Sequence, residues 1–96
     1  MVKHIVMFKL KNRTPETVNQ LKESLSGMEG RIETLRHLEV GEDFKHSERS
    51  CDLVLITHFD NREGLSTYSS HPVHQPVLEL VRSLCSQTWV VDFELP

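Results

Sequence analysis

Two segments of this chain, residues 2–11 and 51–60, alternate in the manner of β-strands but are apolar on both faces. In the first segment, one face carries Val6, Phe8 and Leu10, and the other carries Ile5 and Met7. In the second segment, one face carries Leu53, Leu55 and Phe59, and the other carries Val54 and Ile56. An antiparallel sheet with one solvated face is expected to place polar residues at every second position instead. These strands therefore predict a sheet whose second face is covered, at least in part.

A helix is expected to follow the first strand. Thr14 can cap its N-terminus, and Pro15 suits the first helical position because its missing N–H would have no partner there. An apolar stripe then recurs at helical spacing, at Val18, Leu21, Leu25, Met28 and Ile32. Gly27 and Gly30 are expected to end or fray this helix, which leaves its continuation to Ile32 open.

The segment from residue 61 to residue 84 is expected to form two helices. A short helix opens at residues 61–64 and carries Leu65 and Tyr68. Pro72 ends it, because the residue before a proline is pushed out of the helical region. A further helix presents one apolar stripe, formed by Val77, Leu80, Val81 and Leu84.

Two more strands complete the predicted order of elements. Residues 35–43 form a weaker strand, and residues 88–95 close the chain with Trp89, Val91, Phe93 and Leu95 on one face. Residues 42–50 form a polar connection, either a solvated loop or a flap over a cavity. The order β-α-β-β-α-β is that of an α+β, ferredoxin-like domain with a four-stranded antiparallel sheet and helices on one face. We expect residues 1–96 to form this single domain.

The second face of the sheet needs a partner, because two helices can cover only one face. Ile5, Met7, Val54 and Ile56 would otherwise form an exposed patch of the kind that marks interfaces. The simplest cover is a second copy of the chain related by two-fold symmetry. The sequence therefore predicts a homodimer through the open sheet face, with the two sheets facing each other as a dimeric α-β barrel.

The composition argues against several classes of function. A formal charge of −3 and an aromatic content of 6% do not resemble the footprint of a nucleic-acid binder or of a membrane-surface protein. Residues 1–10 do not follow the pattern expected of a secretory signal, and no apolar run reaches the length of a membrane span. Cys51 and Cys85 are therefore expected to be reduced thiols in a cytoplasm. No zinc spacing, nucleotide-binding glycine motif or histidine-paired cysteine occurs, so neither a metal nor a cofactor is expected.

Titratable side chains are concentrated in residues 68–74, which read Tyr-Ser-Ser-His-Pro-Val-His. A phenol can donate or accept a proton, and histidine titrates near neutrality. On one continuous helix Tyr68 and His74 would point in different directions, but Pro72 and Pro76 disfavour such a helix. A break would let the two side chains converge in one cavity. The alternative is a corner between helices, in which the histidines bond to local backbone.

His4 is a second candidate, because it shares a face of the first strand with Val6, Phe8 and Leu10. A buried histidine must be hydrogen-bonded, and most such residues are structural. His4 is therefore expected to belong to a site only if it approaches residues 68–74.

The chain resembles the stress-responsive A/B barrel (Dabb) family over nearly its whole length. The resemblance is carried by residues 2–9 (Val-Lys-His-Ile-Val-Met-Phe-Lys), Val40-Gly41, residues 52–55 (Asp-Leu-Val-Leu) and residues 68–74. It implies a ferredoxin-like subunit and a homodimer with its sheets packed face to face, which the two-sided strands predict independently.

The resemblance also implies a site. Plant polyketide cyclases of this family use a histidine and a tyrosine in a cavity between sheet and helices, and by motif these correspond to His74 and Tyr68. The histidine would take a proton from a poly-β-keto chain, and the tyrosine would hold a carbonyl. His4 falls on a further pocket-lining position. The remaining residues expected to contact a substrate are Val6, Leu21, Leu25 and His71. Leu21 and Leu25 stand where those cyclases have aromatic side chains, so the expectation is either a pocket of different shape or one filled by core side chains.

Three hypotheses of function follow. The first is a small cytoplasmic homodimer that binds an apolar or aromatic molecule, with acid–base chemistry at His74 and Tyr68. The second is a non-catalytic dimeric module with a stress-related or structural role. The third is a cofactor-free oxygenase-like enzyme, which related dimeric barrels suggest by analogy of fold.

Overall fold

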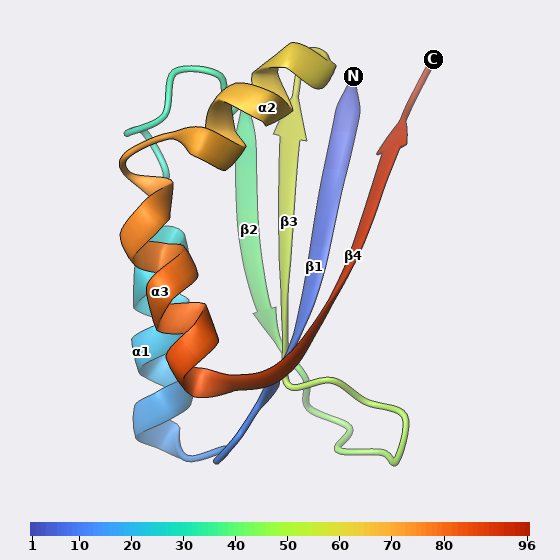
Figure 1. Ribbon diagram of the computed structural model, residues 1–96. Coiled ribbons are helices and arrows are strands. Elements are labelled where there is room, and N and C mark those ends of the chain that lie inside the picture. The colour runs from blue at the N-terminus through green and yellow to red at the C-terminus, as the bar shows by residue number, and fades with distance from the viewer.

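The computed structural model describes all 96 residues and confirms the predicted order β-α-β-β-α-β, with the second helical region split in two (Figure 1). The elements are β1 (Val2–Leu10), α1 (Pro15–Ser26), β2 (His37–Glu42), β3 (Leu53–Phe59), α2 (Arg62–Ser70), α3 (His74–Leu84) and β4 (Cys85–Glu94). No helix among them is long and apolar enough to cross a lipid bilayer.

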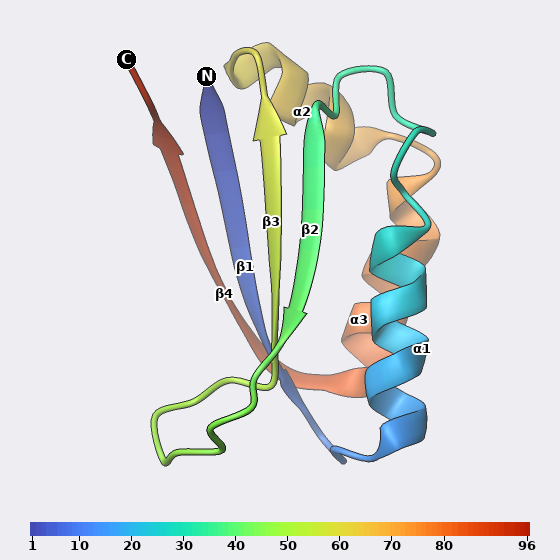
Figure 2. The same cartoon turned by 180° about the vertical axis from the view of Figure 1, so that it is seen from behind.

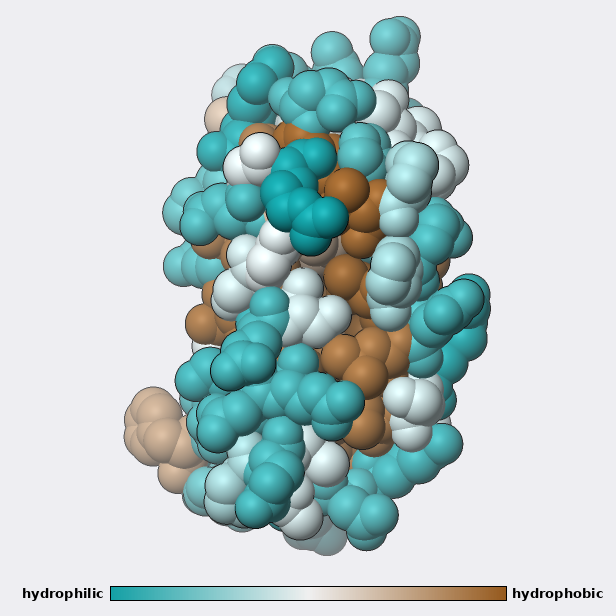
Figure 3. All heavy atoms as spheres, turned by 90° about the vertical axis from the view of Figure 1, so that its left-hand side faces the viewer, coloured by the Kyte–Doolittle hydropathy of each residue, from teal (hydrophilic) through white to brown (hydrophobic).

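The four strands form one antiparallel sheet in the order β2-β3-β1-β4. β1 is therefore a central strand, and Val6 lies opposite Leu55 on one side and Val90 on the other. All three helices lie on one face of this sheet, with α1 and α3 side by side (Figures 1 and 2). The outer side of the helical layer is mostly hydrophilic and is crossed by a band of apolar residues (Figure 3).

The first helix is capped as its sequence predicts. Thr14 is the N-cap, and its hydroxyl accepts a hydrogen bond from the Thr17 amide, while the Thr17 hydroxyl accepts one from the Thr14 amide. The helix ends at Ser26, with Gly27 as its C-cap. Its apolar stripe nevertheless continues into the core, because Met28 and Ile32 remain buried beyond the helix.

The last strand begins three residues earlier than the predicted Thr88, and this boundary is a correction. Cys85 ends α3 in an extended conformation and pairs at once with Leu10 of β1, so no loop separates the helix from the strand. The first residues of β4 carry no apolar alternation, so the sequence did not reveal the earlier start.

The face of the sheet without helices is apolar along its three adjacent strands β3, β1 and β4. The register places seven apolar residues on it: Ile5, Met7, Val54, Ile56, Trp89, Val91 and Phe93. We refer to these seven residues as the open face. Val91 is 58% exposed in the single subunit, and Met7 and Trp89 are exposed as well. The predicted two-sided strands are thus observed, and β4 contributes to the second face more than the sequence indicated.

Candidate functional site

A cavity of about 180 Å³ lies between the helices and the strands β1 and β4. Five of the residues predicted to form a site line it: His4, Val6, Leu25, Tyr68 and His74. Most of the remaining wall is apolar. The site is therefore a small, mainly apolar chamber with three titratable side chains on its surface.

Tyr68 and His74 converge across the break between α2 and α3. His71 caps α2 in an extended conformation, and Pro72 follows it, so α3 starts afresh at His74. The ring centroids of Tyr68 and His74 consequently lie 4.3 Å apart, with 33° between the ring planes. Pro76 is accommodated in the first turn of α3, where no helical partner for its nitrogen is needed.

The tautomer of His74 follows from its one polar contact. Nδ1 lies 3.1 Å from the carbonyl oxygen of Ser69, which can only accept a hydrogen bond, so Nδ1 carries the proton and Nε2 keeps a free lone pair. Burial lowers the pKa of His74, the Ser69 carbonyl partly opposes this, and nearby His4 and His71 lower the pKa further. His74 is therefore a neutral base near pH 7.

The hydroxyl of Tyr68 is buried and has no hydrogen-bond partner within the chain. The side chain is only 1% exposed, and burial raises the pKa of Tyr68 to about 12. The phenol therefore keeps its proton at neutral pH and remains a donor. An unsatisfied buried polar group costs about 1–3 kcal/mol, so this hydroxyl calls for a physical explanation.

His4 approaches the same pair of residues from β1. Its ring meets the Tyr68 ring edge-on, with centroids 5.8 Å apart and 63° between the planes. Its Nδ1 contacts the carboxylate of Asp92, which lies directly opposite on β4. Sequence reasoning missed Asp92. The available signal was an acidic residue on the opposite parity from the apolar residues Val91 and Phe93, but only the register of β1 and β4 pairs it with His4.

Two of the predicted substrate-binding residues, His71 and Leu21, do not line the cavity. His71 accepts a hydrogen bond at Nδ1 from the amide of Val73 (3.1 Å), and its Nε2 lies 3.3 Å from a carboxylate oxygen of Glu33. Its position as the α2 cap thus directs it to the helix corner. Leu21 is wholly buried in the core, one turn before Leu25 on α1.

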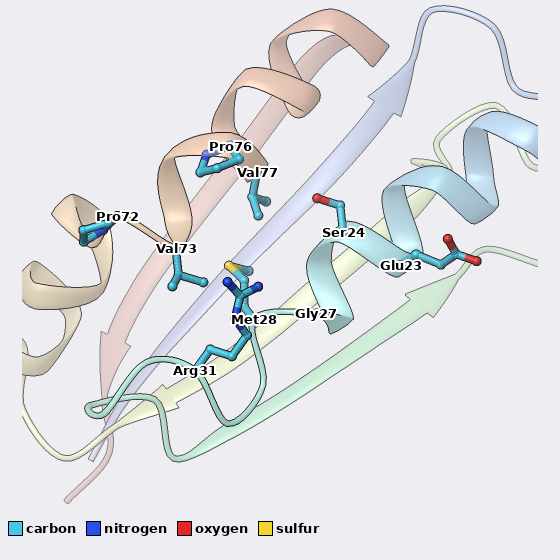
Figure 4. A pocket seen from close by; sticks show the side chains of 9 residues that line it. All are labelled: Glu23, Ser24, Gly27, Met28, Arg31, Pro72, Val73, Pro76 and Val77. Atoms are coloured by element: carbon cyan, nitrogen blue, oxygen red, sulfur yellow. The ribbon is translucent and has the colours of Figure 1, made fainter.

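A separate surface groove of about 420 Å³ lies between the end of α1 and the start of α3 (Figure 4). In Figure 4, Val73 and Val77 face Met28 and Arg31 across it. None of the three titratable cavity residues reaches this groove. Val77 lines both the groove and the inner cavity and is 6% exposed, so its side chain forms part of the partition between them.

The remaining titratable clusters lie elsewhere. The rings of His37 and His58 pair across β2 and β3, with centroids 4.6 Å apart, on the same side of the sheet as the open face. No group of three histidine, cysteine or acidic side chains is placed to hold a metal ion. The chemistry available in the cavity is therefore that of two histidines, one phenol and the carboxylate behind His4.

Comparisons with known proteins agree with this fold. Residues 2–95 match the family described as the Stress responsive A/B Barrel Domain. An uncharacterized protein of Streptomyces coelicolor is 31% identical over 98 residues, which cover 98% of this chain and 99% of that protein.

Two solved structures are also similar. One is a dimeric protein of unknown function with a ferredoxin-like fold, from Bacteroides fragilis, which is 29% identical and superposes with a TM-score of 0.86. The match covers 98% of this chain and 95% of that protein's chain. The other is a dimeric ferredoxin-like protein of unknown function from Thermobifida fusca, which is 25% identical with a TM-score of 0.88. This match covers 98% of the present chain and 90% of the relative's chain. The predicted α+β ferredoxin-like fold is confirmed, and these structural relatives are dimeric.

Proposed function

We propose, from the premise that this chain belongs to the stress responsive A/B barrel domain family, that it binds a small carbonyl compound in the cavity beside Tyr68 and His74. The ligand is apolar or aromatic over most of its surface and carries an acidic C–H next to the carbonyl. His74 acts on it as a base, and Tyr68 as a hydrogen-bond donor.

The unpartnered hydroxyl of Tyr68 is the observation that carries this proposal. A buried donor without an acceptor is rare, and a ligand carbonyl in the adjoining cavity would satisfy it. The apolar wall, which includes Val6 and Leu25, favours a ligand with few polar groups. A volume of about 180 Å³ suits a compact molecule rather than an extended chain.

The proposed chemistry is proton abstraction next to the carbonyl. Nε2 of His74 accepts the proton, and the electron pair of the broken C–H bond moves to the carbonyl oxygen to form an enolate. Tyr68 donates a hydrogen bond to that oxygen, and stabilises it more strongly as its negative charge develops. The Ser69 carbonyl holds the Nδ1 proton of His74 throughout and favours the imidazolium that forms.

His4 and Asp92 support this pair as positioning residues. The carboxylate of Asp92 accepts from Nδ1 of His4, and this contact fixes the orientation of the His4 ring against the ring of Tyr68. The phenol is thereby confined between His4 on β1 and His74 on α3. Its hydroxyl direction is set by packing, because no hydrogen bond sets it.

We propose in addition that two copies of the chain pack through the open face. Seven apolar residues from three strands lie there without a cover, and the solved relatives described above are dimeric. A two-fold axis would make the contact self-complementary, with the same residues on both subunits.

The test of the proposed chemistry uses 1,3-diketones such as acetylacetone as probes. In deuterated buffer, exchange of the hydrogens between the two carbonyls can be followed by NMR. Wild type is expected to accelerate the exchange over buffer, whereas His74→Gln and Tyr68→Phe lose most of the acceleration. His46→Asn, in the exposed loop and at a backbone angle that asparagine tolerates, serves as the matched control.

The outcomes separate this function from the non-catalytic alternative. Equal acceleration by wild type and His74→Gln would remove His74 as the base. A diketone that raises the melting temperature of wild type but is not exchanged would favour a binding module without catalysis. The oxygenase-like alternative stays a prediction, because analogy of fold alone supports it.

A further inference from the structure

Phe44 is the most exposed large apolar side chain of the molecule, at 92%. It lies in residues 43–52, the connection between β2 and β3, which we call the β2–β3 loop. A phenyl ring held wholly in water gains free energy when it is buried, and Phe is among the residues enriched at protein interfaces. Whether the ring contacts a second molecule depends on how the loop holds it and on what lies beside it.

The β2–β3 loop is pinned where it leaves the sheet. Arg13 donates to the carbonyl oxygen of Asp43 (2.7 Å) and to the carboxylate of Asp52 (3.1 Å), so one guanidinium joins the two ends of the loop. Asp52 is buried, and its other carboxylate oxygen accepts from the amide of Leu10 (2.8 Å). The backbone of Asp43 also donates to that of Asp52 (2.9 Å).

The turn after Phe44 is ordered as well. The side chain of Asp43 accepts from the amide of His46 (2.7 Å), and His46 takes a positive φ of 55°. Ser47 and Ser50 bond to each other across the loop. Phe44 thus lies in a hydrogen-bonded turn between Asp43 and His46, and its exposure is a consequence of that turn rather than of a loose chain.

The direction in which the loop leaves the sheet places it beside the open face. At that end of the molecule the β2–β3 loop turns to the side opposite α1 and α3 (Figures 1 and 2). A hollow of about 290 Å³ there is lined by Phe44 together with Met7 and Val54 of the open face. The phenyl ring is therefore continuous with the surface through which we propose that two subunits pack.

We infer that Phe44 is an anchor of the homodimer, with its ring buried against a second copy of this chain. The inference rests on the proposed dimer and adds to it a residue outside the sheet. In a two-fold assembly each subunit would contribute one Phe44 and receive the partner's, so the contact would be made twice. The pinned loop limits the conformational freedom that each ring loses on association.

The test compares the dimer dissociation constants of wild type, Phe44→Ser and Lys45→Ser by sedimentation equilibrium. Phe44→Ser should raise the constant at least about tenfold, since truncating a well-packed aromatic anchor commonly has an effect of this size. Lys45→Ser, at the next exposed position of the same loop, should leave it unchanged. Because Phe44 makes little contact within its own subunit, both variants should unfold at the wild-type temperature as monomers.

A second measurement reports on Phe44 directly. Trp89 is the only tryptophan of the chain, so Trp89→Phe combined with Phe44→Trp places a single reporter in the loop. Its emission should be blue-shifted well above the dissociation constant and should move to the red on dilution through it. Red emission at every concentration of a dimeric protein would overturn the inference.

The failures of the two ideas are distinguishable. A monomeric wild type removes the proposed dimer, and Phe44 with it. A dimeric wild type whose dissociation constant Phe44→Ser leaves unchanged keeps the dimer and removes only the anchor. If that same variant also lost binding to phosphatidylcholine vesicles, the ring would serve a membrane surface instead of a second copy.

Discussion

The rings of Tyr68 and His74 lie 4.3 Å apart although they belong to two different helices. The break at His71 and Pro72 turns the chain so that both side chains line one cavity. The same contact brings together a phenol that keeps its proton and an imidazole that stays neutral.

Tyr68→Phe should stabilise the unliganded protein while it removes most of the acceleration of exchange. The substitution removes a buried hydroxyl without a partner, so the free energy of unfolding should rise by about 1 kcal/mol. Urea denaturation of the two proteins measures this difference. A clear loss of stability would mean that the hydroxyl is satisfied in solution, against the structure.

Acid should destabilise the fold partly through His74. Because its folded-state pKa lies below the ordinary 6.5, the unfolded chain binds a proton first as the pH falls below that value. His74 therefore has little effect on the free energy of unfolding above pH 6.5. As the pH falls below 6.5, His74 lowers the free energy of unfolding progressively, until the pH has passed the pKa of His74 in the folded protein. Burial lowers the pKa of His58 as well, so wild type should show both contributions.

The His74 contribution can be separated by substitution. Urea denaturation at pH 7.5 and at pH 5.5 should show a smaller difference for His74→Gln than for wild type. Equal differences would mean that His74 titrates in the folded protein as it does in the unfolded chain.

Val77→Ala should open the partition between the inner cavity and the surface groove. We expect a loss of about 2 kcal/mol, from two buried carbon atoms and the space they leave. Longer ligands should then fit, so nonane-2,4-dione should raise the melting temperature of the variant more than that of wild type. An unchanged preference between this probe and acetylacetone would show that other residues limit ligand length.

Asp92→Asn should weaken the exchange reaction without unfolding the protein. It removes the charge that holds the His4 ring, and a charge-assisted hydrogen bond at a half-exposed carboxylate contributes about 1.5 kcal/mol at most, or roughly tenfold in rate. Kinetics should show the loss in kcat, with KM little changed, if His4 acts by positioning Tyr68. A change confined to KM would place His4 in ligand binding instead.

Val91→Asp should separate the proposed dimer into monomers. Val91 is more than half exposed in one subunit, so the substitution spares the core but places a charge in the centre of an apolar contact. Analytical ultracentrifugation should show the dissociation constant rising by about a hundredfold or more. Gln20→Asp, on the exposed side of α1, adds the same charge and should have no effect.

Local patterns in the sequence were sufficient for the elements of the fold. The alternation of residues 2–11 and 51–60 identified two strands with apolar second faces, and Thr14 with Pro15 marked the start of α1. These features depend on neighbours along the chain, so propensity and periodicity reveal them. The start of β4 at Cys85 was not predicted, because the first residues of that strand show no apolar alternation.

The candidate site divides in the same way. Pro72 predicted a break between two helices that would let Tyr68 and His74 converge. The sequence left open whether the two side chains do converge. It also suggested His71 and Leu21 as pocket residues, whereas the cap of α2 directs the first towards Glu33 and the core encloses the second.

The sequence by itself determined the order of the elements, the apolar second face and the titratable residues available for a site. Only the tertiary structure decided that Asp92 stands behind His4 across 88 positions of chain, and that β4 adds Trp89, Val91 and Phe93 to the open face. Only the tertiary structure showed that Nδ1 of His74 donates to the Ser69 carbonyl, so that Nε2 is the nitrogen that can accept a proton. The physical reason is that strand register and helix docking are set by packing between distant segments, which no local pattern encodes.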